Sequence, residues 1–308
     1  MKQLLLSIII PVYNEESTIE HVLPALHKTL DNEDVNFEVI FIDDGSTDSS
    51  YDKILKSAKE ESNVTGYRFS RNFGKESAIW AGLQKTKGDC AVVMDCDLQH
   101  PPDIIPEMLR LWKDGNKIVE GIKKRGKEPF FYKVFSGLFY KFISTFSKLD
   151  MKKSSDFKLL DRCVVDALLE LDEKNTFFRG LSFWIGFKST QVEFEVAPRK
   201  YGKTKWSFAK LVKYALSNIS SFTTAPLQIV TIIGSVFIVF AIIVTIQTLI
   251  RFFTGHAVEG FATVILLILF SGGGIMVSLG VIGLYIAKIY DEVKGRPRFI
   301  ISNSTDGL

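Results

Sequence analysis

Short apolar runs alternate with amphipathic segments over the first part of the chain. Runs of strand length that are rich in apolar residues cover positions 4–12, 37–42, 64–69 and 90–94. Segments with the apolar spacing of helices lie between them, at positions 15–30, 49–61 and 75–87. This alternation is typical of a mostly parallel sheet with helices on both faces. The pattern therefore predicts an α/β fold of Rossmann-like type whose ligands bind at the carboxyl ends of the strands.

Two much longer apolar runs follow near the C-terminus. Residues 225–250 and 261–287 contain no charged side chain, and each run exceeds the roughly 20 residues that cross a bilayer. The connection at 251–260 is too short to be a domain. We therefore expect a transmembrane hairpin over 225–288, with helices at 225–251 and 261–288. Buried core helices are the alternative interpretation, and the lengths of the runs disfavour it.

Basic residues flank this hairpin on both sides, so both flanks are expected in the cytoplasm. They are Arg199, Lys200, Lys203, Lys205, Lys210 and Lys213 before it, and Lys288, Lys294, Arg296 and Arg298 after it. The expected organisation is a cytoplasmic domain at 1–205, a juxtamembrane amphipathic helix at 206–224, the hairpin, and a cytoplasmic tail at 289–308 with a frayed end from 302. The protein would then be a multi-pass protein of the inner or plasma membrane.

Composition adds three bounds. A hydrophobic content of 46% and a positive mean hydropathy fit a membrane-anchored chain. A formal net charge of +3 is too small to indicate nucleic-acid binding, since the basic residues gather near the hairpin. Cys90, Cys96 and Cys163 show no paired spacing, so we expect a reduced compartment and three small core residues.

Polar motifs follow each of the first four predicted strands. Two carboxylates one residue apart, Asp95 and Asp97, end the fourth run, and such oxygen ligands suit a hard divalent cation beside a diphosphate. Each motif alone has an ordinary explanation: a turn, a cap of the next helix by Ser46 or Thr47, a packed tyrosine or a solvated lysine. Their occurrence at four successive strand ends favours one ligand site. Its candidate residues are Tyr13, Asp43, Asp44, Asn72, Lys75, Asp95 and Asp97.

These motifs together resemble the family 2 glycosyltransferases of GT-A fold. The matching segments are Pro11-Val12-Tyr13-Asn14-Glu15, Asp43-Asp44-Gly45-Ser46-Thr47-Asp48, Ser70-Arg71-Asn72-Phe73-Gly74-Lys75 and Asp95-Cys96-Asp97-Leu98-Gln99-His100-Pro101-Pro102. Within this family, and with its C-terminal hairpin, the chain resembles the polyprenyl-phosphate glycosyltransferase group, which includes the bactoprenol glucosyltransferases and dolichyl-phosphate mannose synthase. The resemblance implies transfer of a sugar from a nucleotide diphosphate to a lipid phosphate at the cytoplasmic membrane face, with inversion.

The resemblance also implies roles for single residues. Pro11, Tyr13, Glu15 and Asp43 would contact the nucleotide, and Asp44, Asn72 and Lys75 would lie in the same donor site. Asp95, Asp97 and Gln99 would surround Mg²⁺ or Mn²⁺ and the donor diphosphate, with Asp97 as the direct ligand. Cys96 departs from the family pattern, and its side chain should face away from the metal, because soft sulfur does not suit these cations.

Two further segments resemble acceptor-side parts of the family. Asp156 is the candidate acceptor-side carboxylate; the alternative is an N-cap of a helix predicted at 159–171. Because a phosphate acceptor is already largely ionised near pH 7, Asp156 would position it or stabilise positive charge on the sugar. Arg199 and Lys205 would bind phosphate, and a polybasic contact with anionic lipid is the alternative.

Amphipathic stretches at 130–149 and 206–222 favour helices lying in the headgroup region, with core packing as the alternative, and the basic loop at 123–127 would cover a phosphate. The expected activity is a metal-dependent inverting transfer, with a UDP-sugar (glucose or N-acetylglucosamine) preferred over a GDP-sugar. A processive polysaccharide synthase and a noncatalytic nucleotide-binding assembly partner are the alternatives. Glycines at 272–274, 280 and 283 would allow close helix contact in a homo-oligomer.

Overall fold

The computed structural model describes residues 3–31, 33–124, 155–174, 177–195, 225–254 and 260–306. The chain divides into two compact units, one formed by Met1–Ser207 with Pro297–Leu308 and the other by Phe208–Arg296. The expected interfacial stretches, the end of the basic loop, Arg199 and Lys205 all lie outside the described residues.

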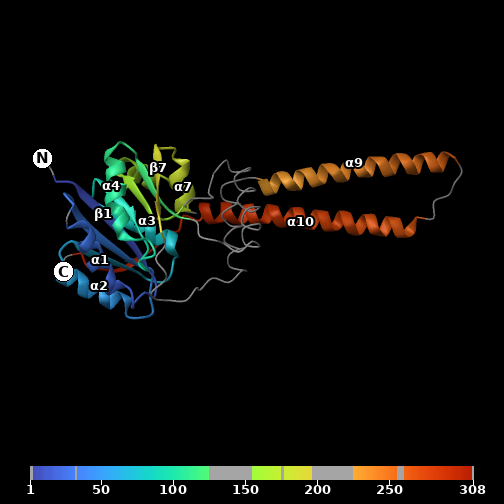
Figure 1. Cartoon of the computed structure of the whole chain (residues 1–308). Helices are drawn as coiled ribbons and strands as arrows, with labels where there is room; N and C mark the ends of the chain where they lie inside the picture. Colours follow the sequence, from blue (N-terminus) through green and yellow to red (C-terminus); the bar gives the residue numbers. More distant parts are fainter. Residues whose placement is uncertain are drawn as a thin grey trace. The chain divides into compact units, whose positions relative to one another are not determined.

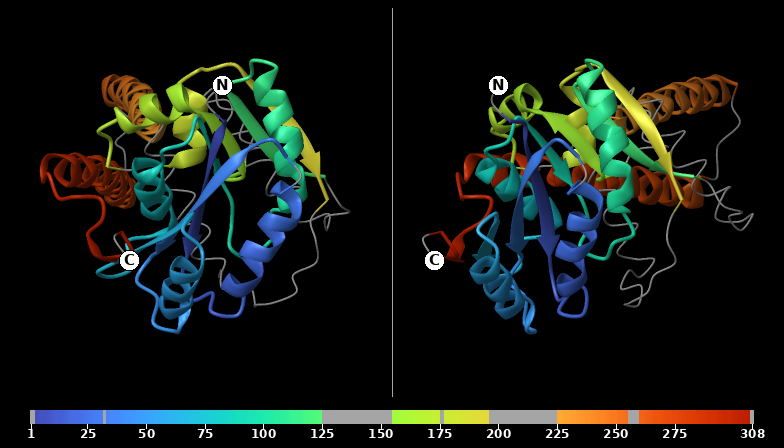
Figure 2. Two further views of the ribbon diagram at one scale, coloured as in Figure 1. Left: turned by 90° about the vertical axis from the view of Figure 1, so that its left-hand side faces the viewer. Right: turned by 60° about the vertical axis from the view of Figure 1, so that its left-hand side comes forward.

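One eight-stranded sheet forms the centre of the first unit, in the order β7-β5-β6-β4-β1-β2-β3-β8 (Figures 1 and 2). The pairs β1–β2, β1–β4, β2–β3 and β5–β7 are parallel, whereas β6 and β8 run antiparallel to their neighbours. The mostly parallel α/β fold is thus confirmed. The strands are β1 (Leu5–Val12), β2 (Asn36–Asp43), β3 (Val64–Phe69), β4 (Cys90–Val93), β5 (Ile118–Lys123), β6 (Lys158–Asp161), β7 (Ser189–Phe194) and β8 (Ile301–Ser304).

Helices cover both faces of this sheet (Figure 2). On one face, α1, α2 and α4 pack in a core cluster with alternate residues of β1, including Leu6, Ile8 and Ile10. On the other face, α3 lies against β1 and β2, with α6 and α7 beside it. The approach of α3 is close, since a Cβ atom at Gly82 would overlap the side chain of Ile9. The helices are α1 (Ile19–Leu30), α2 (Ser50–Glu60), α3 (Lys75–Lys85), the short 3-10 turn at Pro102–Ile104, α4 (Ile105–Lys113), α6 (Arg162–Leu169) and α7 (Phe178–Trp184).

Two helices of the first unit begin several residues after their expected starts. The helix predicted from 15 begins at Ile19, because the chain from Asn14 to Glu16 is bonded instead to side chains of the 46–50 segment. The helix predicted at 159–171 is wrong in its first part, since Lys158–Asp161 is a strand and α6 starts only at Arg162. The N-cap of α6 is Asp161, whose side chain accepts a hydrogen bond from the Cys163 amide. Asp156 is therefore not a helix cap.

The end of the chain was expected to fray from 302, and this is wrong for 302–304. These residues belong to β8, which pairs with the edge strand β3. The hydroxyl of Thr305 accepts a hydrogen bond from the Gly66 amide at 2.8 Å, and the ring of Phe299 stacks on Phe69. The tail is ordered because it satisfies the backbone groups of an edge strand and covers an apolar side chain.

The second unit contains α9 (Ala225–Phe253) and α10 (Phe261–Val293). Val230–Arg251 and Phe270–Val293 are long and apolar enough to cross a membrane, with mean hydropathies of 2.5 and 1.7. None of either stretch is buried within the protein, which distinguishes both helices from core helices of a soluble domain. The second helix extends five residues beyond the expected end at 288.

Cysteine placement confirms two of three expectations. Cys90 and Cys96 are buried, and both pack in the main core cluster. Cys163 is exposed at the start of α6, so its assignment as a core residue is wrong.

Candidate active site

The first two motifs are joined by hydrogen bonds at the carboxyl ends of β1 and β2. The Asn14 amide donates to Ser46 Oγ at 2.9 Å, and Asn14 Oδ1 accepts from the Thr47 amide at 2.9 Å. The Glu15 amide donates to Ser50 Oγ at 2.9 Å. Because α2 begins at Ser50, neither Ser46 nor Thr47 is its cap. The polar side chains of this segment instead fix the backbone that follows β1.

Asp43 ends β2 with a fully buried side chain. Its Oδ1 accepts from the Ser46 amide at 3.0 Å, and its Oδ2 lies 3.2 Å from Arg68 Nε. Oδ2 has no hydrogen-bond partner among the residues that the structure describes. Burial raises the pKa of this carboxyl against the opposing effects of Ser46 and Arg68. A buried acceptor of this kind is costly unless a donor completes it.

Asp44 joins the second motif to the third. It accepts hydrogen bonds from the amides of Phe73 at 2.6 Å and Gly74 at 2.9 Å. Burial raises its pKa to about 6, although these amides act in the opposite direction. Gly45 has φ +67°, and a Cβ atom there would lie 2.6 Å from the carbonyl carbon of Arg71. Glycine is therefore required by both the backbone conformation and the close contact.

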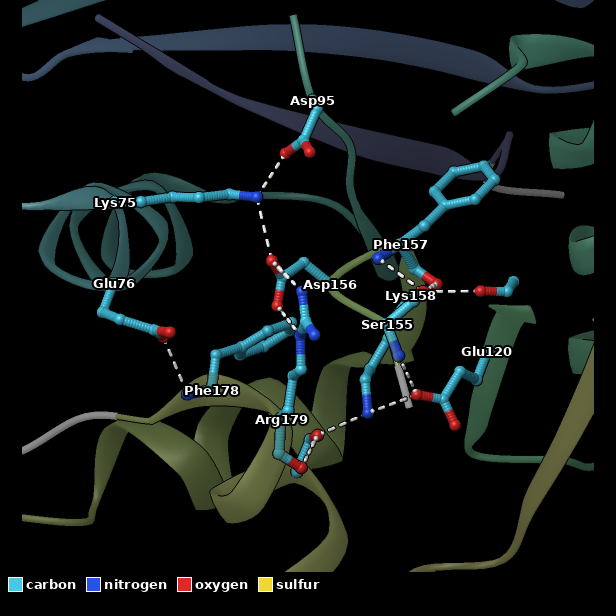
Figure 3. A network of polar contacts seen from close by, with 12 residues as sticks. Lys75, Glu76, Asp95, Glu120, Ser155, Asp156, Phe157, Lys158, Phe178 and Arg179 are labelled. Carbon is cyan, nitrogen blue, oxygen red and sulfur yellow. Dashed lines mark hydrogen bonds and ion pairs between the residues drawn. The ribbon is translucent and has the colours of Figure 1, made fainter. Parts of the chain in front are cut away.

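Lys75, the first residue of α3, connects two carboxylates, those of Asp95 and Asp156 (Figure 3). Its Nζ lies 2.6 Å from Asp95 Oδ1 and 2.8 Å from Asp156 Oδ2. Arg179, in the first turn of α7, binds Asp156 from the other side through Nε to Oδ1 at 2.6 Å and Nη2 to Oδ2 at 2.9 Å. Asp156 is thus held between two cations, one of which also holds Asp95.

The meeting of Asp95 and Asp156 follows from the register of β4 and β6. These strands are antiparallel, and Val93 pairs with Lys158. Continuing that register by two residues on each strand places Asp95 opposite Asp156. The residues before β6 therefore lie at the same edge of the sheet as the residues after the parallel strands.

Charge determines the ionisation of this cluster. Burial alone would raise the pKa of Asp156, but the charge of Lys75 and then the bonds from Arg179 hold it well below its usual range. For Lys75, the neighbouring carboxylates outweigh burial and raise its pKa above its usual range. Both groups are therefore charged throughout the neutral range. The pKa of Glu76 is raised to about 7 by burial first and by the charge of Asp156 second.

The segment after β4 turns sharply around Asp97. Leu98 has φ 55°, and Asp97 Oδ1 accepts from the Gln99 amide at 3.1 Å. His100 is buried, its Nδ1 accepts from the Asp95 amide at 3.1 Å, and its ring stacks on Phe157 with centroids 5.0 Å apart. The stack links the segment after β4 to the segment before β6.

The oxygen donors of Asp95, Asp97 and Gln99 fit a hard cation. Within the described ranges, no group of three or more His, Cys, Asp or Glu side chains is placed to hold a metal ion. A protein-only cage is thus not formed there. The donors suit a cation such as Mg²⁺, which uses one or two carboxylates and takes its other ligands from water and substrate phosphate.

A second ion pair lies beside Asp156, within the sheet. Lys158 Nζ is 3.0 Å from Glu120 Oε1 and donates to Ser182 Oγ at 2.8 Å. The pair is cross-strand, since Glu120 and Lys158 are partners in the β5–β6 register. Ser155 also donates its amide to Glu120 Oε1, at 2.8 Å. These contacts fix the backbone on both sides of Asp156.

The structure brings Lys75, Asp95 and Asp156 together, and it places the other predicted donor-site residues at the same edge of the sheet. Tyr13 is 42% exposed, Pro11 and Glu15 are half-buried, and Asn72 is exposed. Sequence reasoning missed Glu76 and Arg179. A signal was available for Arg179, because it is the one charged residue in the seven-residue helix α7.

Comparison with known proteins decides the family. The model of glycosyl transferase family 2 matches residues 7–169. The chain belongs to this family. It is 40% identical over 306 residues to CsbB of Bacillus subtilis, a protein named as a glycosyltransferase. The match covers 99% of this chain and 93% of that protein. It is 35% identical over 315 residues to the bactoprenol glucosyl transferase of Shigella phage SfII, with 98% and 99% covered.

A crystal structure of glucosyl-3-phosphoglycerate synthase from Mycobacterium tuberculosis, in complex with Mn²⁺ and UDP-glucose, aligns with a TM-score of 0.49. It is 21% identical and covers 70% of this chain and 77% of that one. A likeness at this level carries no conclusion about substrate or metal. The family membership and the full-length relatives identify the chain as a glycosyltransferase.

Proposed function

We propose that this glycosyltransferase moves a monosaccharide from a nucleotide diphosphate sugar to a polyprenyl phosphate at the cytoplasmic face of the membrane, with inversion at the anomeric carbon. The observation that carries the proposal is the single ammonium group of Lys75 between Asp95, on the donor-side motif, and Asp156, on the acceptor-side motif. Full-length relatives named bactoprenol glucosyl transferase support the lipid acceptor.

The donor nucleotide would occupy the ends of β1 and β2. Asp43 ends β2 at this edge of the sheet, and its carboxylate, which pairs with Arg68, would accept a hydrogen bond from an N–H of a base or from a ribose hydroxyl. The exposed ring of Tyr13 can stack on the base. UDP is the preferred nucleotide, with glucose or N-acetylglucosamine as the sugar, and a GDP-sugar is the second choice. Asp44 would act mainly by holding the 73–74 backbone, because its oxygens already accept from those amides.

Mg²⁺ or Mn²⁺ would be held by Asp97, with Asp95 and Gln99 in its surroundings. When bound, such a cation supplies charge neutralisation for the departing diphosphate. Lys75 would place a further positive charge beside this diphosphate. It lies at the start of α3, where backbone amides and the helix dipole also favour an anion.

The acceptor phosphate would bind beside Asp156 and the two cationic side chains that hold it, Lys75 and Arg179. A phosphate monoester has a second pKa of about 6, so its attacking oxygen needs little help from a base near pH 7. Asp156 is ionised and held by Lys75 and Arg179, which suits a positioning and charge-stabilising group. In the proposed step the acceptor oxygen bonds to the anomeric carbon while the bond to the diphosphate oxygen breaks. Arg199 and Lys205 would add phosphate contacts.

The membrane hairpin would anchor the enzyme in the bilayer that holds its lipid acceptor. The exposed apolar surfaces of α9 and α10 fit lipid contact, and the basic flanks predict a cytoplasmic catalytic domain. A homo-oligomer through the glycine-rich part of α10 stays a prediction.

The test is to incubate membranes containing the protein with undecaprenyl phosphate and a panel of radiolabelled nucleotide sugars, with and without a chelator. We expect one sugar to label the lipid and the chelator to abolish labelling. No labelling with any donor would refute the lipid acceptor, and full labelling in the chelator would refute the metal.

A further inference from the structure

We infer that Glu76 is a positioning residue that fixes the two cations around Asp156 by joining the start of α3 to the start of α7. The inference rests on the proposed function of that site and adds a residue which the family motifs did not indicate. Glu76 would touch neither substrate, and it would act through Lys75 and Arg179.

The geometry is a closed loop of contacts (Figure 3). Glu76 Oε2 accepts a hydrogen bond from the Phe178 amide at 2.8 Å. The chain neighbours of these two residues, Lys75 and Arg179, both bind Asp156. One bond between residues 102 positions apart therefore holds two cationic side chains at a common carboxylate.

Loss of this bond would affect Arg179 most. Lys75 is fixed by α3, which packs on β1 and β2. In contrast, α7 is only seven residues long and depends more on contacts with side chains of neighbouring elements for its position. The bidentate contact of Arg179 with Asp156 needs the guanidinium plane to face both oxygens. A small shift of α7 would break that geometry without unfolding the domain.

The chemistry of Glu76 points to hydrogen bonding rather than to charge balance. Burial and the charge of Asp156 raise the pKa of Glu76, and the charges of Lys75 and Arg179 act in the opposite direction. Glutamine can also accept from the Phe178 amide, so Glu76→Gln keeps the contact, and Glu76→Ala removes it. The two variants therefore separate the bond from the charge.

The experiment compares full-length wild type, Glu76→Ala and Glu76→Gln in the lipid-labelling assay. Glu76→Ala should lower kcat about 10- to 100-fold with the donor KM nearly unchanged, because misplacement by about 1 Å can cost that much. Glu76→Gln should retain most of the rate. Glu20→Ala is the matched control, since Glu20 also lies in the first turn of a helix and its side chain is 58% exposed in its ion pair with Lys53.

Hydrogen exchange gives a readout that does not depend on activity. Amides of 178–184 should lose protection in Glu76→Ala, regain it in Glu76→Gln, and stay unchanged in Glu20→Ala. Unchanged protection of α7 in Glu76→Ala overturns the inference, and so does a wild-type kcat. Equal loss of kcat in both Glu76 variants also overturns it, because charge would then be the cause. Absence of lipid labelling by wild type would refute the proposed function, and the exchange data would still decide the role of Glu76.

Discussion

Asp156→Asn is the substitution that most directly tests the proposed acceptor side. It keeps the size of the side chain and removes its charge. The wild-type carboxylate receives Lys75 Nζ at 2.8 Å, Arg179 Nε at 2.6 Å and Arg179 Nη2 at 2.9 Å. An asparagine offers one acceptor oxygen and turns an N–H group towards another donor. The variant therefore loses part of the cation clamp and leaves two positive charges close together.

The expected effects on stability and turnover differ in size. Hydrogen bonds to charged groups contribute about 1.5–3 kcal/mol each. The side chain of Asp156 is 7% exposed, but Lys75 and Arg179 are 41% and 37% exposed, so water recovers much of their lost interaction. We expect unfolding free energy to fall by only about 2 kcal/mol. Turnover should fall about 100- to 1000-fold, as for loss of one electrostatic contact to a transition state.

The assay measures lipid labelling by purified full-length protein at saturating donor, with donor affinity measured separately by calorimetry. We expect donor affinity to stay within about threefold of wild type. Because the pKa of Asp156 lies well below its usual range, the loss should be the same from pH 6 to pH 9. Asp166→Asn is the control, since Asp166 also pairs with an arginine but is 57% exposed.

Two results would refute this reasoning. Wild-type turnover in Asp156→Asn would remove Asp156 from the site. A rate that recovers as the pH rises would identify Asp156 as a general base, because hydroxide can replace a base but cannot replace a charge-stabilising group.

Four further predictions concern the donor site and the fold. Asp97→Ala should abolish lipid labelling while membrane insertion, checked by carbonate extraction, stays normal. Gly45→Ala should raise the donor KM about tenfold or more, because its left-handed φ costs about 1–2 kcal/mol and its Cβ meets backbone. Thr305→Val should lower unfolding free energy by about 1–3 kcal/mol in thermal unfolding, since the Gly66 amide loses its acceptor. Burial acts to raise the pKa of Asp161, but hydrogen bonds outweigh it and lower the pKa to about 2. Asp161→Asn should therefore cost about 2 kcal/mol at neutral pH, and this difference should shrink as the pH falls from about 4 towards 2, measured by tryptophan fluorescence.

Each of these predictions has a contradicting result. Metal-dependent labelling by Asp97→Ala would show that the metal binds elsewhere. An unchanged donor KM in Gly45→Ala would show that donor binding does not need the close contact between the second and third motifs. A Thr305→Val midpoint equal to that of wild type would mean that the tail adds nothing to stability. A pH-independent loss in Asp161→Asn would exclude its carboxylate charge as the cause.

The regular part of the fold was predictable because local pattern and tertiary packing agree there. The third strand, Val64–Phe69, has the predicted bounds, and the starts of β4 and α3 also match. The prediction was wrong where tertiary contacts replace local preference. The predicted helix does not start at 15 because the Glu15 and Glu16 amides bond to side chains of the next motif, and 158–161 is a strand because it pairs with both β4 and β5. Ile301–Ser304 is ordered by pairing with an edge that the tail sequence does not reveal.

The sequence alone determined the alternation of strands and helices, the polar residues at four strand ends and the apolar length of two helices, since each depends on spacing along the chain. It also carried the resemblance to the family to which the chain belongs. Only the tertiary structure decided that Asp156 meets Asp95 across one lysine, and that Arg179 and Glu76 complete the contact. The reason is physical: the antiparallel register of β4 and β6 and the docking of α7 on α3 join residues far apart in the sequence, and no local periodicity encodes such pairings.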